Sequence, residues 1–458
     1  MSTFAKRLKS AVADGPESVL VFLGNIEVEE QWARGEAGLP TLSSQGARAL
    51  THRMDEFALL LGEPTDHVLL KTAPDPDFHS YLVDYGLARA QVHAVGAQQT
   101  GRTVTKDVLE DPDTLALLKE LGREGAYLAP HGVSDLEQEV AERCGLRLAT
   151  SPADLCKRVN SKLFSRRLAD RLRIRQPEGM VCETPEELAE AVEYAEGLLA
   201  QGRTVVAKDA FGVSGKGVMV VEEQRRLAWL RRTVERAHSR SGKLGLILEE
   251  WISKDRDLNY QVIVAKDGSV AFDFVKEAIT ENGVHKGHRI PAGLTPGHEA
   301  EIRDAGLAIG RALADEGYRG VVGIDALLGT DGRAYPLTEI NARYNMSTYQ
   351  AALQEVLMRD HSCAEARQYP LRLNAPLPFA VLRRELDHLM VASPGDPGIV
   401  INNFATVNAV GGPSKGREHF DGRLYAFLVG PDPESVSALD HRLGRILADI
   451  EKGEVSRA

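Results

Sequence analysis

The sequence predicts a soluble α/β protein built from more than one domain. The chain has 458 residues, which is more than one ordinary hydrophobic core accommodates. Short apolar runs alternate with helical patterns in its first third, which is typical of an open parallel sheet. Two Asp-Gly turns, Asp267-Gly268 and Asp331-Gly332, lie between β-rich segments and predict hairpins in the middle third.

Composition narrows the class of protein. The formal net charge of -11 argues against a nucleic-acid partner. No apolar run is long enough to span a membrane, and residues 1–15 show no signal peptide. The four cysteines form no C-x-x-C pair, which argues against a zinc ribbon or a disulfide framework and favours reduced thiols in the cytoplasm.

Residues 1–150 are expected to form the first α/β domain. Apolar runs bounded by turn residues predict strands at 18–24, 67–71 and 126–130. Helical periodicity predicts helices at 47–61, 114–121 and 135–144.

Residues 151–370 are expected to form the central domain. Leu163, Leu168 and Leu172 share one helical face, and Asn160-Ser161-Lys162 stand at its start. Thr184 is a predicted N-cap, followed by proline and glutamates, for a helix reaching about Ala200. A lid subdomain is expected at about 200–255, and NGVHKGHRIPAG, which contains Arg289, is expected to be a basic loop.

Residues 371–458 change in character and predict a small α+β domain of their own. Its strand candidates are IVINNFATVNAV and RLYAFLVG, and a closing helix is expected from about Pro433 to Ile450.

The most informative segment is the glycine-rich stretch VVAKDAFGVSGKGVMVVE, residues 205–222. A P-loop needs glycine where Ala210 stands and Ser or Thr where Gly217 stands. A nucleophile elbow needs a glycine where Lys216 stands. A loop between two strands fits the flanks, and its backbone N–H groups could approach phosphate oxygens. A plain flexible hairpin loop remains the alternative.

The second predicted hairpin gathers polar side chains on one face. Asp325 and Glu339 are nearly equidistant from the Asp331-Gly332 turn, so they should lie almost opposite each other. Asn341 and Arg343 follow Glu339 at alternate positions of the same strand. Two adjacent carboxylates and an amide suit Mg²⁺, and Arg343 could clamp a phosphoryl group. A solvated strand of alternating polar residues is the alternative.

Taken in order, Lys162, Lys208, the glycine-rich loop, the EEWI segment at 249–252, Asp325 and E-x-N-x-R resemble the ATP-grasp superfamily of carboxylate–amine ligases. The resemblance covers about residues 151–350 and implies an ATP-grasp core preceded by an α/β pre-ATP-grasp domain. It implies ATP and Mg²⁺ as cofactors, with the metal ligands Asp325, Glu339 and Asn341. The implied catalytic residues are Arg343, Arg289 and Lys208, of which Arg289 rests on its basic loop alone. The implied ATP-binding residues are Lys162, Lys208, Phe211, Gly212, Ser214, Gly215, Lys216, Gly217, Glu249, Glu250, Trp251, Ile252 and Asp257, with Asp255 as the alternative to Asp257 at the ribose.

The flanking thirds are similar to those of the actinobacterial pheganomycin-type peptide ligases, in the stretches VFLGNIEVEEQW, APHGVSDLEQEVAERCGL and NNFATVNAVGGPSKGREHFDGRLYAFLVG. This resemblance implies that a nonproteinogenic, guanidino-bearing amino acid is joined through its carboxylate to the amino group of a peptide. The superfamily also makes a homodimer possible. Three alternatives stay open: a ligase for small amino-acid metabolites, a bicarbonate-using carboxylase, and an ATP-binding regulatory protein without turnover. The retained Asp325, Glu339, Asn341 and Arg343 argue against the last.

Overall fold

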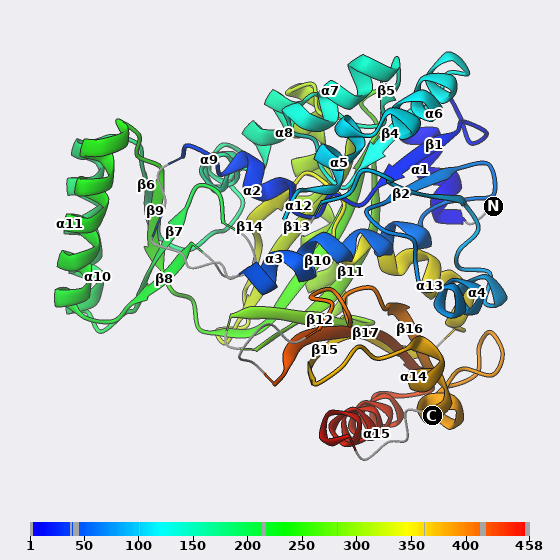
Figure 1. Cartoon of the computed structure of the whole chain (residues 1–458). Coiled ribbons are helices and arrows are strands. Elements are labelled where there is room, and N and C mark those ends of the chain that lie inside the picture. Colours follow the sequence, from blue (N-terminus) through cyan, green and yellow to red (C-terminus); the bar gives the residue numbers. More distant parts are fainter. Residues whose placement is uncertain are drawn as a thin grey trace.

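The computed structural model describes residues 3–36, 39, 45–99, 101–212, 217–281, 283–360, 362–412 and 418–453. Ser214, Gly215 and Lys216, predicted to bind nucleotide, lie outside the described residues. Three sheets organise the rest of the chain (Figure 1). None of the described helices is long and apolar enough to cross a membrane.

The first sheet is parallel, as the alternating pattern predicts. Its strand order is β3-β2-β1-β4-β5, from β1 (Leu20–Leu23), β2 (His67–Leu70), β3 (Gln91–Ala94), β4 (Tyr127–Pro130) and β5 (Arg147–Leu148). Every residue of β1, β2 and β4 is buried, which is typical of parallel strands covered on both faces. The helices of this region are α1 (Thr3–Val12), α2 (Val28–Trp32), α3 (Gln45–His52), α4 (Pro76–Asp84), α5 (Val104–Glu110), α6 (Pro112–Arg123) and α7 (Asp135–Cys144).

The helix expected at 47–61 is shorter than predicted. After α3 the chain continues as the 3-10 helix η1 (Arg53–Leu60), whose residues from Met54 onward are all buried. Two acids in η1 anchor backbone from elsewhere. Asp55 accepts a hydrogen bond from the Lys71 N–H, and Glu56 accepts from the N–H groups of Phe404 and Ala405 at 2.6 and 2.7 Å.

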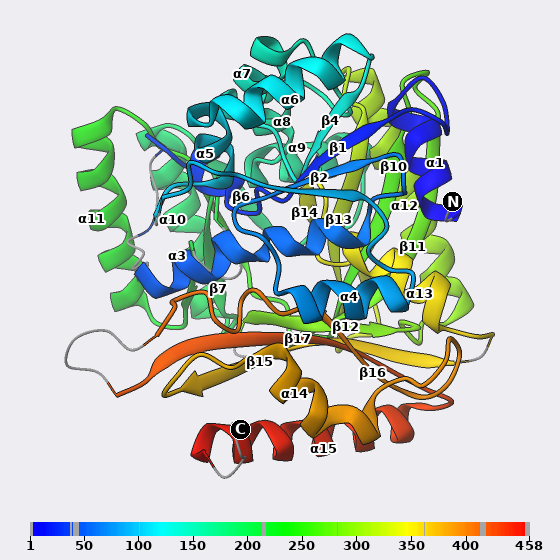
Figure 2. The same ribbon diagram turned by 45° about the vertical axis from the view of Figure 1, so that its right-hand side comes forward.

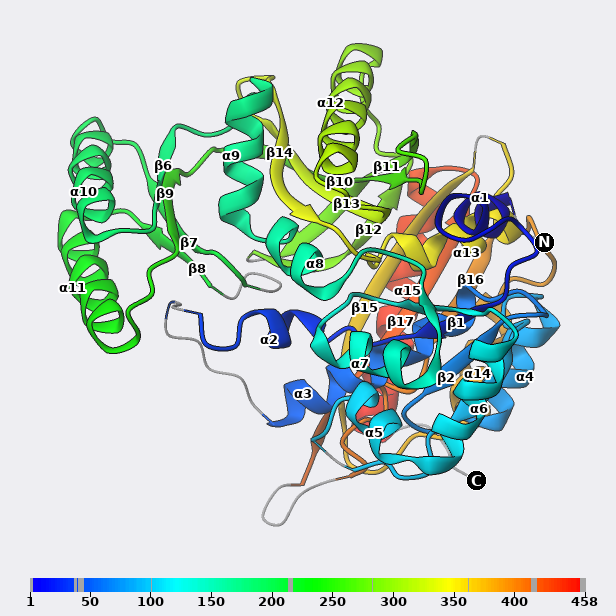
Figure 3. The same cartoon turned by 90° about the horizontal axis from the view of Figure 1, so that it is seen from above.

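The second sheet, with the order β6-β9-β7-β8, forms a lid subdomain at one side of the molecule (Figure 3). It contains β6 (Gly179–Cys182), α10 (Pro185–Ala200), β7 (Val205–Asp209), β8 (Val218–Val221), α11 (Gln224–Ser241) and β9 (Leu246–Glu250). The capping box predicted at Thr184 is present, with Glu187 as its reciprocal partner. β7 and β8 pair as an antiparallel hairpin, which confirms that the glycine-rich loop joins two strands.

The third sheet has eight strands in the order β14-β13-β10-β11-β12-β15-β17-β16. Its first part comprises β10 (Lys254–Val264), β11 (Val270–Glu281), β12 (Val284–Ile290), α12 (Pro296–Asp315), β13 (Gly320–Gly329) and β14 (Ala334–Asn341). Both predicted hairpins, β10–β11 and β13–β14, are confirmed. The predicted basic loop around Arg289 is instead strand β12, which pairs with β11 and β15 along its length. Two helices, α8 (Ala153–Val159) and α9 (Lys162–Leu172), precede the lid.

The C-terminal strands continue this sheet rather than forming one of their own. They are β15 (Cys363–Leu373), β16 (Gly398–Asn403) and β17 (Phe420–Gly430), accompanied by η2 (Thr348–Gln350), α13 (Ala351–Leu357), α14 (Phe379–Leu386), η3 (Asp387–Leu389) and α15 (Pro433–Lys452). β15 itself runs through the predicted boundary at residue 370 and pairs with β12 on one side and β17 on the other. Helix α15 covers β15 and β17, while α3 and η1 lie on their other face (Figure 2). The boundaries 1–150, 151–370 and 371–458 stay predictions.

One apolar core joins the first and last thirds of the chain. Phe78 and Tyr81 on α4 pack against Phe379, with ring centroids 5.2 and 5.1 Å apart. The Tyr81 hydroxyl accepts a hydrogen bond from the Ile401 N–H at 3.0 Å. This contact makes the parallel sheet and the C-terminal strands one packed unit.

Candidate active site

The predicted carboxylate pair forms on the β13–β14 hairpin. Asp325 and Glu339 are directly paired across the two strands, as the turn predicts. Asn259, on β10, pairs with Asp325 from the other side, and its amide nitrogen donates to Asp325 Oδ1 at 2.8 Å. A row of polar side chains therefore crosses three adjacent strands.

The environment of Asp325 makes its carboxyl group harder to ionise than an exposed aspartate. Burial raises the pKa of Asp325 to about 6, and the neighbouring Glu339 carboxylate adds to the rise. Hydrogen bonds from Asn259 and Asn341 oppose it. A bound cation would remove this conflict because it neutralises both carboxylates.

Lys162 brings the start of α9 to this row. Ser161 caps α9 through its hydroxyl, which places Lys162 at the first position of the helix. Its ammonium group hydrogen-bonds the Glu339 carboxylate and the Gly212 carbonyl, the latter at 3.0 Å. Lys162 thus links the predicted metal site to the start of the glycine-rich loop.

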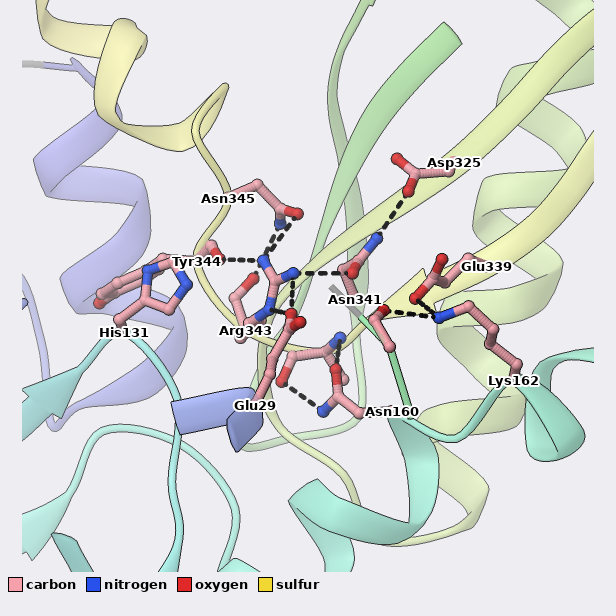
Figure 4. Close-up of polar contacts among 12 residues, drawn as sticks. Glu29, His131, Asn160, Lys162, Asp325, Glu339, Asn341, Arg343, Tyr344 and Asn345 are labelled. Carbon is pink, nitrogen blue, oxygen red and sulfur yellow. Dashed lines mark hydrogen bonds and ion pairs between the residues drawn. The ribbon is translucent and has the colours of Figure 1, made fainter. Parts of the chain in front are cut away.

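Arg343 lies beside the row, and each nitrogen of its guanidinium group has at least one acceptor (Figure 4). Its Nε and one terminal nitrogen grip the Glu29 carboxylate, and that terminal nitrogen also donates to Asn341 Oδ1 at 2.9 Å. The other terminal nitrogen donates to the Tyr344 carbonyl and to Asn345 Oδ1. The ion pair is largely buried, with each side chain 14% exposed.

The residues around Arg343 are positioned from several distant segments. Asn160 accepts from the Ala342 N–H at 2.9 Å, and the His131 carbonyl accepts from the Tyr344 N–H at 2.9 Å. A Cβ atom at Gly323 would lie 2.0 Å from the Asn345 amide nitrogen, so the close approach of Asn345 requires glycine there.

The third predicted metal ligand, Asn341, is turned differently from the expectation. Its amide nitrogen donates to Asp325 Oδ2 at 3.0 Å, while its oxygen accepts from Arg343. Coordination of a cation through this oxygen would require the amide to turn over. Among the described residues no group of three or more His, Cys, Asp or Glu side chains could hold a metal. The predicted set has only two carboxylates.

Lys208 and Glu249, both predicted to bind nucleotide, pair with each other. Glu249 is held between Lys208 and Arg166, and the latter lies 2.7 Å away. Glu249 is only 5% exposed, so its carboxylate serves as a counter-charge inside the lid subdomain. Sequence reasoning missed Arg166, which lies on α9, four residues from Lys162.

The predicted hinge segment follows β9. Arg203 holds the Glu250 carboxylate, and the Trp251 N–H donates to the Thr204 carbonyl at 2.8 Å. The indole of Trp251 is 37% exposed, and Ile252 is partly buried. Phe211, which follows β7, is partly buried. Gly217, directly before β8, has a φ of +75°.

Asp257 and Asp255, the two candidates for binding the ribose of ATP, differ in their position in the fold. Asp257 alternates with Asn259 on β10 and so shares the face of Asp325. Its carboxylate accepts hydrogen bonds from Lys254 and from the Thr280 hydroxyl, the latter at 2.6 Å. Asp255 is exposed and contacts only its neighbour Arg256 among the described residues. Asp257 therefore fits the predicted role better than Asp255.

Arg289 does not join these residues. Its partner in the neighbouring strand β11 is Glu277. Glu277 directly follows Lys276, which is the β11 partner of Asn259. Since neighbouring positions of a strand point to opposite faces, Arg289 lies on the face away from Asp325. It forms ion pairs there with Glu277 and Glu365. The prediction that Arg289 is catalytic assumed a loop at this position. Arg289 instead lies on strand β12, and the strand directs its side chain away from the site.

The site also contains polar residues that sequence reasoning missed. Lys276 is fully buried and donates to the Ser347 carbonyl at 2.9 Å and to Gln350 Oε1 at 3.1 Å. The Ser347 hydroxyl donates to Asn259 Oδ1 at 2.6 Å. Asn259 was detectable, because it follows Asp257 at i+2. Glu29 carried no local signal, because it lies 314 residues from Arg343.

Comparison with known proteins agrees with this architecture. A model of the pre-ATP-grasp domain matches residues 54–146, and a model of the carbamoyl-phosphate synthase L chain ATP-binding domain matches residues 162–353. The [butirosin acyl-carrier protein]–L-glutamate ligase of Niallia circulans is 25% identical over 363 residues, covering 79% of this chain and 81% of that protein.

Solved structures show the same fold over nearly the whole chain. An ADP complex of N5-carboxyaminoimidazole ribonucleotide synthetase has a TM-score of 0.54 at 13% identity, covering 95% of this chain and 98% of that one. A related synthase from Aspergillus clavatus, also with ADP, has a TM-score of 0.53 at 15% identity, covering 94% and 99%. The chain is therefore an enzyme with the ATP-grasp fold and a pre-ATP-grasp domain, and the matches support an ATP-dependent ligase.

Proposed function

We propose that this enzyme is a peptide ligase that activates an amino-acid carboxylate and joins it to the amino group of a peptide. The observation that carries the proposal is the half-buried Asp325–Glu339 pair with Lys162 and Arg343 beside it, where Lys162 also reaches Gly212 at the start of the lid loop. This arrangement offers two acids for Mg²⁺ and two cations for phosphoryl oxygens. The proposal that the donor amino acid carries a guanidino group rests on the resemblance of the flanking segments to the pheganomycin-type ligases.

The reaction follows from these charges. The donor carboxylate oxygen attacks the γ-phosphorus of ATP, the bond to the bridging oxygen breaks, and ADP leaves. The amine nitrogen then attacks the acyl carbon, phosphate leaves, and the amine loses a proton to give the amide. Mg²⁺ held by Asp325 and Glu339 would neutralise charge on the phosphates. Lys162 and Lys208 are proposed to contact the phosphates, and the lid loop to exclude water.

Arg343 must exchange a partner to take part. Each nitrogen of its guanidinium group already has an acceptor, and among the described residues Glu29 is the charged one. An acyl phosphate is also anionic, so it can replace Glu29 at the same donors. We propose that Glu29 holds Arg343 until the anion arrives.

A second candidate differs only in the acceptor. The Niallia circulans relative is named as a ligase that acts on an acyl-carrier protein. An amine acceptor attached to a carrier protein is therefore an alternative to a free peptide.

The test is ADP release from magnesium-ATP with a panel of amino-acid carboxylates, with or without a short peptide or an amino-acylated carrier protein. Products are identified by mass spectrometry. We expect ADP and a new amide mass only when donor and acceptor are both present. Glu339→Gln should abolish turnover in a folded protein, whereas Glu190→Gln on the exposed side of α10 should not. Near wild-type turnover of Glu339→Gln would contradict the metal assignment. ADP release with free amino acids as the only acceptors would contradict the peptide acceptor.

A further inference from the structure

Helix α11 is strongly basic in an acidic protein. Its 18 residues, QRRLAWLRRTVERAHSRS, contain six arginines and one glutamate, a net charge of +5 with histidine neutral. The whole chain carries -11. So concentrated a charge on one helix is unlike the rest of the chain.

Four of the six arginines of α11 lie on one face, which we call the arginine face. Its residues, Arg225, Trp229, Arg232, Arg236 and Arg240, are spaced by four, three, four and four positions. This spacing places them in one stripe along the helix. All five are exposed, and the Trp229 indole is 46% exposed. Leu227 and Leu230 are fully buried on the opposite side, which anchors the helix to the lid sheet.

The charge of the arginine face is not neutralised within the chain. In the described part of the structure, Arg232, Arg236 and Arg240 have no carboxylate within ion-pair distance, and Arg225 has Glu223 only at 3.9 Å. Arg231, which lies outside the face, pairs with Glu235 at 2.8 Å. Most arginines around the predicted active site are paired in this way. Within the described residues these arginines therefore lack close carboxylate partners, although the acidic helix α10 packs beside α11 and lowers the local positive potential.

The location of the face leaves the active site open. α11 follows β8, the strand after the glycine-rich loop, and lies at the edge of the molecule in Figures 1 and 3. A partner bound to α11 would hold the subdomain that carries the lid loop without covering the β13–β14 hairpin.

We propose that the arginine face binds an acidic protein that carries the amine acceptor, an inference that rests on the ligase function proposed above. Arginine pairs bidentately with carboxylates, and an exposed tryptophan between arginines is the composition of an interface anchor. The face is about 23 Å long, since each helical residue rises about 1.5 Å, which suits a small folded domain. The Niallia circulans relative is named as a ligase that acts on an acyl-carrier protein, which favours a protein as the partner.

The test measures binding of two acidic probes to the full chain: fluorescent poly-L-glutamate and an amino-acylated acyl-carrier protein. We expect both to bind at about 50 mM salt and to weaken as salt rises. The variant Arg225→Glu/Arg232→Glu/Arg236→Glu/Arg240→Glu should lose at least about tenfold in affinity for each. The control variant, Arg123→Glu/Arg311→Glu/Arg442→Glu/Arg445→Glu, makes the same charge change at exposed sites elsewhere and should bind nearly as the wild type. A variant with the same four arginines changed to glutamine adds no negative charge, so it should also lose affinity even if the glutamate variant misfolds.

Each other outcome overturns the proposal. Absence of binding by the wild type, or equal loss in face and control variants, shows that the face binds no acidic protein. Tighter face-dependent binding of duplex DNA or phosphatidylglycerol vesicles assigns it to another class of partner. A dimer that dissociates in the face variant assigns it to a second copy, whose exposed α10 glutamates (Glu186, Glu190, Glu193 and Glu196) are complementary. ADP release with a free acceptor should be unchanged in the face variant, so failure of the ligase function is seen separately.

Discussion

The ion pair between Glu29 and Arg343 is expected to be a strong energetic link between the first α/β region and the β13–β14 hairpin. Glu29 lies on α2, and its carboxylate accepts a hydrogen bond from Arg343 Nε and forms an ion pair with one terminal nitrogen. We consider the substitutions Glu29→Gln and Arg343→Met, alone and together. Met keeps much of the side-chain volume of arginine, and Gln keeps one oxygen acceptor.

The magnitude follows from the burial of the pair. Both side chains are 14% exposed, so a charge left alone here is poorly hydrated. Removing one member of a buried pair costs about 3–5 kcal/mol, and the remaining exposure reduces this to about 2–3 kcal/mol for Arg343→Met. Glu29→Gln should cost about 2 kcal/mol, because a hydrogen bond to a neutral oxygen replaces a charged one. The double variant should lose less than the sum, with a coupling of about 1.5 kcal/mol or more.

The assay is urea unfolding of the four proteins at constant pH, with the m value as the check that one transition is followed. The control cycle uses Arg143 and Glu139 on α7, an exposed pair with side chains 46% and 50% exposed. Its coupling should be only about 0.3–0.5 kcal/mol. Additivity of the Glu29 and Arg343 substitutions within about 0.5 kcal/mol would refute the assignment of this pair as a link between the two regions.

Two further predictions concern pH. Burial raises the pKa of Glu27 to about 8, with nearby Glu137 and Asp55 adding to the rise, whereas the unfolded value is 4.5. The unfolded state therefore releases this proton first, and the free energy of unfolding falls by about 3 kcal/mol between pH 5 and 8; Glu27→Gln should remove that fall, and an unchanged difference between pH 5 and 8 would contradict it. Burial holds the pKa of Lys276 well below 10.5, so folding releases a proton and this lysine destabilises the fold below the unfolded pKa. In urea unfolding, Lys276→Met should therefore become more stable relative to the wild type as pH is lowered from 9 to 6. A stability difference that does not change between pH 9 and 6 would show that the lysine is charged in the fold.

The local elements of this protein were predictable because their signals are local. The Thr184 capping box and the Ser161 cap set helix starts, and the Asp-Gly turns set the register that brings Asp325 opposite Glu339. The motif order then indicated the ATP-grasp fold. Arg289 shows the limit of such reasoning, because its side chain's direction depends on the strand and its neighbours.

By itself, then, the sequence determined the hairpins, the caps and the spacing of the polar residues on β13 and β14, all of which depend on contacts within a few tens of residues. Only the tertiary structure decided which charges meet. Glu29 reaches Arg343, Arg166 reaches Glu249, and β15 joins β12. Pairing between distant segments leaves no periodic pattern in either one, because each partner is an ordinary polar residue or strand until packing brings the two together.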